Sequence, residues 1–132
     1  MKNLIFILIV FGVVACGGVR VTRDDASQAQ FAEKPTDEEA IRKIRGYLDS
    51  VLIDPDSLRL KCSTVRKGWG RHNMYDKPTF GWVVYCDVNA KNKLGGYSGG
   101  KPHLFIINGS YFTAIDRPDI VDGSGTHSGF LD

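Results

Sequence analysis

The sequence lacks the features that mark most enzymes and nucleic-acid-binding proteins. Its 132 residues carry a formal net charge of only +2, so no excess of basic residues indicates a nucleic-acid partner. The three histidines, His72, His103 and His127, are too far apart for a zinc-binding motif. The longest apolar run, residues 4–15, is shorter than the roughly 20 residues of a membrane-spanning helix. The sequence thus predicts no metal, no cofactor, no nucleic acid and no spanning helix.

The glycine-rich stretch GGYSGGKP, residues 95–102, comes close to a phosphate-binding loop but lacks its chemistry. Such a loop needs a serine or threonine directly after its lysine, and then a helix whose N-terminus faces the phosphates. Here Pro102 follows Lys101, and the next segment has the apolar pattern of a strand. We therefore interpret the stretch as a connection between two strands and predict no nucleotide site.

Residues 1–15 have the layout of a secretory signal, with a basic start, an apolar middle and small residues at the end. The end of this segment and the cysteine after it resemble the lipobox of bacterial lipoproteins: Val13-Val14-Ala15-Cys16. The resemblance implies that the Cys16 thiol is lipidated, that the leader is cleaved before Cys16, and that the new amino group is acylated. The alternative is an ordinary signal peptide whose cysteine is accidental.

Lipidation predicts an exported protein anchored to a membrane, because several acyl chains bind stably whereas one chain binds only marginally. In enterobacterial lipoproteins an aspartate after the cysteine retains the protein on the inner membrane. In a Gram-negative cell, Gly17 at this position implies the outer membrane, facing the periplasm. After cleavage 16 basic and 15 acidic residues remain, a balance that indicates no nucleic-acid partner.

The two remaining cysteines agree with export. Cys62 and Cys86 form an even pair, which in an oxidising periplasm indicates a disulfide. Both lie on the apolar faces of segments with a period of two. If they pair in an antiparallel hairpin, Leu60 faces Val88, so apolar side chains meet apolar ones. The alternative is two buried free thiols.

Residues 16–35 show no sustained period, and we interpret them as a lipidated N-terminus and flexible tether. A helix is predicted to begin at Thr36, which forms a capping box with Glu39, and to end at Asp54-Pro55. Its apolar residues recur at steps of three and four, which predicts one core-facing stripe: Ile41, Ile44, Leu48, Val51 and Leu52.

The period then changes to two, which predicts strands. Asn108-Gly109 between two apolar runs indicates a two-residue hairpin turn. We therefore predict an α+β fold over residues 36–115, with one N-terminal helix packed on a four-stranded antiparallel meander sheet. Residues 116–132, rich in glycine, serine and aspartate, are predicted to form a flexible C-terminal tail.

A second resemblance covers residues 36–115. The turn DPDS and the stretch GWVVYCDVNAKNKLGGYSGGKPHLFI are similar to a domain of small uncharacterised bacterial envelope proteins. That family shows a DP-x-S turn, a strand that runs into VNAKN-x-x-GGY-x-G, and then an apolar strand. The resemblance implies an envelope domain of this fold, and it implies no activity.

Residues 66–78, RKGWGRHNMYDKP, are predicted to form a long loop that mixes basic and aromatic side chains. Such a mixture suits an anionic glycan, a lipid headgroup or an acidic protein. The alternative is a loop whose aromatic residues fold back onto the sheet. The partner-binding candidates from this loop and from the family pattern are Trp69, Arg71, Tyr75, Asn89, Lys91, Asn92 and Tyr97.

No catalytic residues are predicted, because the hydrolase-like residue types in DGSGTHSG lie in a glycine-rich segment without a rigid frame. We therefore predict a lipid-anchored envelope protein that acts as a binding or assembly module and has no catalytic activity. The expected partners are the membrane, through the lipid, and an envelope protein or an anionic glycan or lipid. The alternatives are an inhibitor of a lysozyme-type cell-wall-degrading enzyme and a small periplasmic hydrolase.

Overall fold

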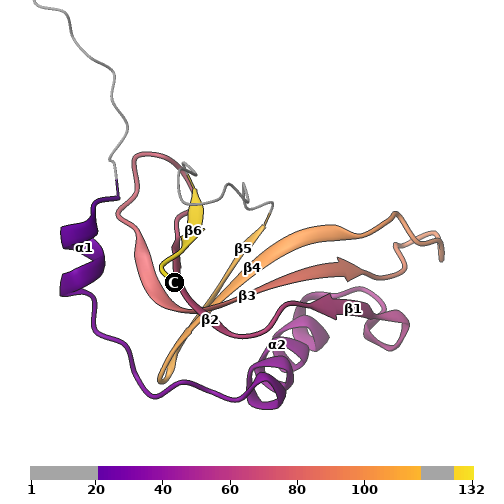
Figure 1. Ribbon diagram of the computed structural model, residues 1–132. Helices are drawn as coiled ribbons and strands as arrows, with labels where there is room; N and C mark the ends of the chain where they lie inside the picture. Colours follow the sequence, from indigo (N-terminus) through magenta and orange to yellow (C-terminus); the bar gives the residue numbers. More distant parts are fainter. Residues whose placement is uncertain (1–20, 117–126) are drawn as a thin grey trace, which may run out of the picture.

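The computed structural model describes residues 21–116 and 127–132, which form helices and one antiparallel sheet (Figure 1). The elements in chain order are α1 (Arg23–Gln28), α2 (Asp37–Val51), the short 3-10 helix η1 (Pro55–Ser57), β1 (Arg59–Cys62), β2 (Arg66–Gly70), β3 (Thr79–Asn89), β4 (Lys101–Asn108), β5 (Tyr111–Asp116) and β6 (Ser128–Phe130). The sheet order is β5-β4-β3-β2-β6, and β1 also pairs with β3. The α+β class and the antiparallel sheet are confirmed, whereas the expected four strands are too few.

Helix α2 begins where the capping box predicts. The Thr36 side chain accepts a hydrogen bond from the Glu39 backbone N–H, and the Glu39 carboxylate accepts one from the Thr36 backbone N–H. These bonds satisfy two donors that a helix start leaves without partners. The bond from the Thr36 backbone N–H, followed by the one from its hydroxyl, lowers the pKa of Glu39. This local chemistry explains why the start of α2 was predictable.

The loop expected over residues 66–78 is wrong in part, because residues 66–70 form β2, and both β1 and β2 pair with β3. Cys62 pairs with Cys86 as predicted, but Arg66 pairs with Val83. The chain therefore advances four residues on one side and three on the other, which defines a bulge with one extra residue. Within the bulge the Ser63 hydroxyl accepts a hydrogen bond from the Tyr85 backbone N–H at 3.1 Å.

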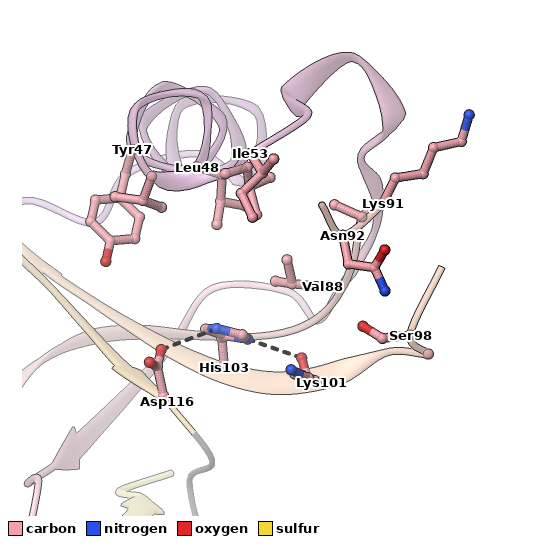
Figure 2. Close-up of a pocket in the computed structure, with 14 residues that line it drawn as sticks. Tyr47, Leu48, Ile53, Val88, Lys91, Asn92, Ser98, Lys101, His103 and Asp116 are labelled. Atoms are coloured by element: carbon pink, nitrogen blue, oxygen red, sulfur yellow. Dashed lines mark hydrogen bonds and ion pairs between the residues drawn. The ribbon is translucent and has the colours of Figure 1, made fainter. Parts of the chain in front are cut away.

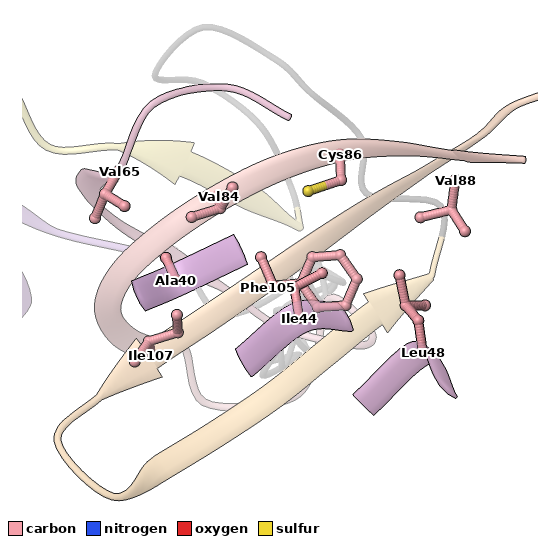
Figure 3. Packing of buried hydrophobic residues seen from close by; sticks show 9 residues of the cluster. All are labelled: Ala40, Ile44, Leu48, Val65, Val84, Cys86, Val88, Phe105 and Ile107. Carbon is pink, nitrogen blue, oxygen red and sulfur yellow. The ribbon is translucent and has the colours of Figure 1, made fainter. Parts of the chain in front are cut away.

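The main core lies between α2 and one face of the sheet (Figure 3). It contains the alternating residues Val84, Cys86 and Val88 of β3, together with the buried side chains of α2: Ala40, Ile44 and Leu48. Phe105 from β4 is fully buried among them. The predicted stripe is thus confirmed at Ile44 and Leu48, whereas Val51, at the end of α2, is 54% exposed.

The opposite face of the sheet is also buried, which the alternation did not predict. A smaller cluster there contains Val83, Leu104, Ile106 and Ile115. The curled β2 approaches this cluster so closely that a Cβ on Gly70 would lie 2.6 Å from Leu104 and 2.7 Å from Ile115. A Cβ there would force these side-chain ends to shift, so Gly70 lets β2 bend over the second face without displacing them.

The C-terminal segment expected to be a flexible tail contains β6, which pairs with β2. The last residue, Asp132, forms an ion pair of 2.7 Å with Arg66, and the Arg66 guanidinium lies 3.7 Å from the Phe130 ring centroid. Ser128 is fully buried. These contacts hold the end of the chain on the sheet. No local sequence pattern predicts them.

Part of the segment expected to be a flexible tether, residues 16–35, is also folded. Helix α1 forms, and residues 30–32 dock on the far end of the sheet. The Ala32 N–H donates to Asn108 Oδ1 at 2.7 Å, and Asn108 Nδ2 donates to the Gln30 carbonyl at 2.8 Å. The Trp82 indole N–H donates to the Ala32 carbonyl at 2.8 Å, and the Phe31 ring packs edge-on against Trp82. The folded unit therefore begins before residue 36.

The turn after β4 explains why the Asn108 side chain can form hydrogen bonds with residues 30–32. Asn108 pairs with Tyr111, so the two turn residues are Gly109 and Ser110 and not Asn108 and Gly109 as predicted. Gly109 has a φ of +63°, which glycine adopts without steric cost. The shift by one residue places the Asn108 side chain against the docked N-terminal segment.

Asn108→Ala is expected to lower the free energy of unfolding by about 1–3 kcal/mol in a chain that begins at residue 21, because the partly buried Ala32 N–H loses its acceptor and the Gln30 carbonyl loses a donor. Urea unfolding followed by tryptophan fluorescence measures the change. In a chain that begins at residue 36, the same substitution should cost much less. Equal losses in both chains would contradict the docking of residues 30–32.

Candidate functional site

The candidate residues of the 66–78 segment lie in different environments. Trp69 belongs to β2 and is 5% exposed, and Arg71 is also 5% exposed, with its guanidinium 5.7 Å from the Trp69 ring centroid. Tyr75 is 72% exposed. The alternative in which the aromatic residues fold back onto the sheet therefore describes Trp69. Its burial and that of Arg71 count against direct contact with a partner, whereas Tyr75 remains accessible.

The candidates Lys91, Asn92 and Tyr97 lie at the end of the sheet that carries the loop between β3 and β4, where this loop meets η1. The Lys91 backbone N–H donates to Ser57 Oγ at 2.8 Å, and the Tyr97 hydroxyl donates to the Ser57 carbonyl at 2.8 Å. The Arg59 guanidinium lies 3.9 Å from the Tyr97 ring centroid. Ser57 thus connects the DPDS turn to the glycine-rich loop, two parts that are distant in sequence.

Asn92 shapes the tip of this loop. Its Oδ1 accepts hydrogen bonds from the backbone N–H groups of Leu94, at 2.9 Å, and Gly96, at 3.3 Å. Gly95 has a φ of +79°, as expected of a glycine that the turn requires. Asn92 therefore has a structural role, and within residues 21–116 and 127–132 its Nδ2 group makes no hydrogen bond.

Asn89 lies at the end of β3, and its Oδ1 atom is buried. Within residues 21–116 and 127–132 this oxygen accepts no hydrogen bond. A buried acceptor without a partner costs free energy, and an ordered water molecule is the usual solution. Asn89 does not line the groove described next.

A groove with a cavity volume of about 440 Å³ lies between the end of α2 and the β3–β4 loop (Figure 2). One wall comes from α2 and the residues directly after it, and the other wall comes from β3, β4, their loop and the last residue of β5. Figure 2 shows Tyr47, Leu48 and Ile53 on the helix side, across from Asn92 and Ser98. The lining residues are Tyr47, Leu48, Val51, Leu52, Ile53, Val88, Ala90, Lys91, Asn92, Ser98, Gly99, Lys101, His103 and Asp116.

His103 lies in this groove with both ring nitrogens engaged. Nε2 is 3.0 Å from Asp116 Oδ1, and Nδ1 is 2.9 Å from the Lys101 carbonyl oxygen. Both contacts are with oxygens that accept hydrogen bonds, one of a carbonyl and one of a carboxylate. No ring nitrogen faces Ser98 as a base, so the serine, histidine and aspartate of this groove do not form a nucleophilic triad.

Outside the groove, burial raises the pKa of the Tyr85 hydroxyl, while hydrogen bonding to Ser128 and the charge of Arg66 oppose the shift. Tyr85 packs edge-on against Phe130 on the second face of the sheet. The shift therefore reflects core packing and identifies no catalytic group.

Two further properties bear on the site. In the part of the chain that the structure describes, no group of three or more histidine, cysteine, aspartate or glutamate side chains could hold a metal ion. None of the helices in residues 21–116 and 127–132 is long and apolar enough to cross a membrane. The leader and Cys16 lie outside the described residues.

Comparison with known proteins gives no match: no protein-family model, curated protein or solved structure is significantly similar to this chain.

Sequence reasoning identified the loop side of the groove through Lys91 and Asn92 but missed the helix side. Tyr47, Val51 and Ile53 looked like ordinary members of an amphipathic helix and its end. One available signal was the apolar pair Leu52-Ile53 directly before Asp54-Pro55. These apolar residues lie beyond the last residue of α2, so the helix does not bury them in its apolar stripe.

Proposed function

We propose that this chain is a lipid-anchored protein of the bacterial cell envelope, and that its α+β domain binds an envelope protein through the groove between α2 and the β3–β4 loop. The observation that carries the proposal is the exposure of large apolar side chains along this groove. Val51 is 54% exposed, Ile53 is 62% exposed and Tyr47 is 36% exposed. Exposed apolar residues that cluster beside a concave surface are typical of a binding site.

The position at which residues 30–32 dock on the sheet supports this arrangement. Residues 30–32 are held at the Asn108 end of β4, whereas the groove lies beside Lys101 at the other end. Eight residues of antiparallel strand span about 25 Å. Figure 1 shows α1 and the β3–β4 loop at opposite ends of the molecule. An anchor at Cys16 would therefore hold the groove away from the membrane surface, toward partners in the periplasm.

The docked segment also limits the distance from the anchor. Four residues lie between Cys16 and Val21, the first residue that the structure describes, and the five steps from one Cα atom to the next reach at most about 18 Å. The anchor would thus keep α1 close to the lipid surface, closer than a flexible tether of residues 16–35 would. In this arrangement the anchor limits the distance between the groove and the membrane surface.

A photo-cross-linking amino acid at position 53 in intact cells tests the proposal. The wild-type anchor should give one predominant cross-linked envelope protein, identified by mass spectrometry. The same amino acid at position 75 is the control for an exposed site far from the groove. With Cys16→Ser, acyl labelling of the chain and its recovery with membranes should both be lost, because the lipid attachment site is gone.

Each outcome has a defined meaning. A cross-linked muramidase would favour the inhibitor alternative over an assembly role. Equal cross-linking from positions 53 and 75, or none from either, would contradict a binding role for the groove. Unchanged membrane recovery of the Cys16→Ser protein would contradict the lipid anchor.

A further inference from the structure

The two walls of the groove differ in chemistry. The helix wall presents Val51 and Ile53, both more than half exposed, with Tyr47 beside them. Single exposed apolar side chains are common on protein surfaces, but a group of them on one wall of a groove exposes a continuous apolar strip. This wall suits bulky apolar side chains of a ligand.

The loop wall presents hydrogen-bond donors. Asn92 Nδ2, Ser98 Oγ and Lys101 Nζ make no hydrogen bond or ion pair with any residue in the described ranges, 21–116 and 127–132. The Oδ1 atom of Asn92 is already used by the loop backbone, which fixes its amide as a donor on this side. Donors from an amide, a hydroxyl and an ammonium group together suit a carboxylate.

The charge of the groove also favours a ligand that carries carboxylates. Its lining contains Lys91 and Lys101, and its one acidic residue, Asp116, is 3.0 Å from His103 Nε2. The two lysines outnumber this one carboxylate, so the residues that line the groove carry a net positive formal charge, although the Lys91 side chain extends outward from the groove in Figure 2. An acidic ligand is attracted to this surface, and a basic ligand is repelled.

We infer that the groove binds an extended peptide segment of the partner in which acidic and bulky apolar residues alternate. This inference rests on the proposed function and deepens it. In an extended chain, successive side chains point to opposite sides. Alternation therefore directs the apolar side chains to Val51 and Ile53 and the carboxylates to Asn92, Ser98 and Lys101. A volume of about 440 Å³ is within the usual range of ligand sites.

Fluorescence anisotropy with the lipidated mature chain in detergent tests the inference. The probe is a labelled eight-residue peptide, blocked at both ends, in which leucine alternates with glutamate. Two control peptides replace every glutamate by lysine or every leucine by serine. The leucine–glutamate peptide should bind at least about tenfold more tightly than either control, because each control removes the match to one wall.

Substitutions on the protein assign the binding to the groove. Ile53→Ser and Lys101→Glu should each weaken binding of the leucine–glutamate peptide by about fivefold to tenfold. The matched controls are Tyr111→Ser, an exposed aromatic residue at the start of β5 that does not line the groove, and Lys93→Glu, a lysine of the same loop that does not line the groove. Both controls should bind as the wild type does. All four positions are exposed, so the variants should keep the wild-type melting temperature.

Three results would overturn the inference: equal binding of the three peptides, wild-type binding by Ile53→Ser and Lys101→Glu, or binding of phosphatidylglycerol vesicles without binding of the peptide. If the peptide fails to bind but position 53 still cross-links one envelope protein, the alternating peptide is wrong and the binding role of the groove stands. If both experiments fail, the proposed function falls with the inference.

Discussion

Phe105→Ala is expected to lower the free energy of unfolding by about 3–5 kcal/mol, the loss that follows truncation of a fully buried aromatic side chain. Phe105 is 0% exposed and lies at the centre of the core between α2 and the sheet. Its ring contacts Tyr47 at 6.1 Å, Phe112 at 5.9 Å and His103 at 6.0 Å between centroids. The substitution therefore removes apolar burial, leaves a cavity and breaks three ring contacts.

The size of this loss decides whether the domain stays folded. Domains of this length are stable by about 5–15 kcal/mol, so the substitution would remove a large fraction of the total. Urea unfolding of a chain that begins at residue 21 measures it. Tyr111→Ala is the control, because Tyr111 is 49% exposed at the start of β5 and should cost far less. A similar loss for both variants would contradict the core described here.

Phe105 also links the core to the groove, because its ring stacks on His103 and packs against Tyr47. If the Phe105→Ala protein stays folded, loosened packing should spread to both groove residues and weaken binding of the acidic, apolar peptide. This consequence connects the stability of the domain to its proposed function.

Reduction of the Cys62–Cys86 disulfide is expected to lower the free energy of unfolding by about 3 kcal/mol. The two cysteines are 24 residues apart, and a cross-link over that separation restricts the unfolded chain. In the folded state the bond holds β1 to β3 at the edge of the bulge, where Cys62 pairs directly with Cys86. The free thiols stay in the core, since Cys86 is only 3% exposed, so the loss comes mainly from the unfolded state.

Urea unfolding with and without dithiothreitol measures this effect on a chain that begins at residue 21 and therefore lacks Cys16. The midpoint should fall by about 1–3 M on reduction, given the usual dependence of stability on urea. The double variant Cys62→Ala/Cys86→Ala is the matched control, because its midpoint should not respond to the reductant. Labelling of both cysteines by iodoacetamide in the native, unreduced protein would show that the bond is absent.

The features predicted correctly from the sequence arise from contacts between near neighbours or from regular alternation. The start of α2 depends on Thr36 and Glu39, three residues apart, whose hydrogen bonds form in the helix itself. The pairing of Cys62 with Cys86 follows from alternation, because a shift by one residue would move every apolar side chain to the wrong face. The same reasoning gave Leu60 opposite Val88.

The features that were missed depend on segments that are distant in sequence. Trp69 resembled an exposed loop residue because its neighbours are glycines and basic residues, yet β6 and the bent sheet bury it. Phe31 belonged to a segment without a period, and it is held through Trp82 and Asn108. No pattern within either segment specifies these partners.

The sequence by itself determined the capped helix, the apolar face of β3 and the disulfide register, because hydrogen bonds and alternation over a few residues encode them. Only the tertiary structure decided that the sheet bends at Gly70 over its second face, that residues 30–32 dock on Asn108, and that α2 and the β3–β4 loop enclose a groove. The physical reason is that each of these features requires two distant segments to meet. The contacts between these segments form only when the whole chain has folded.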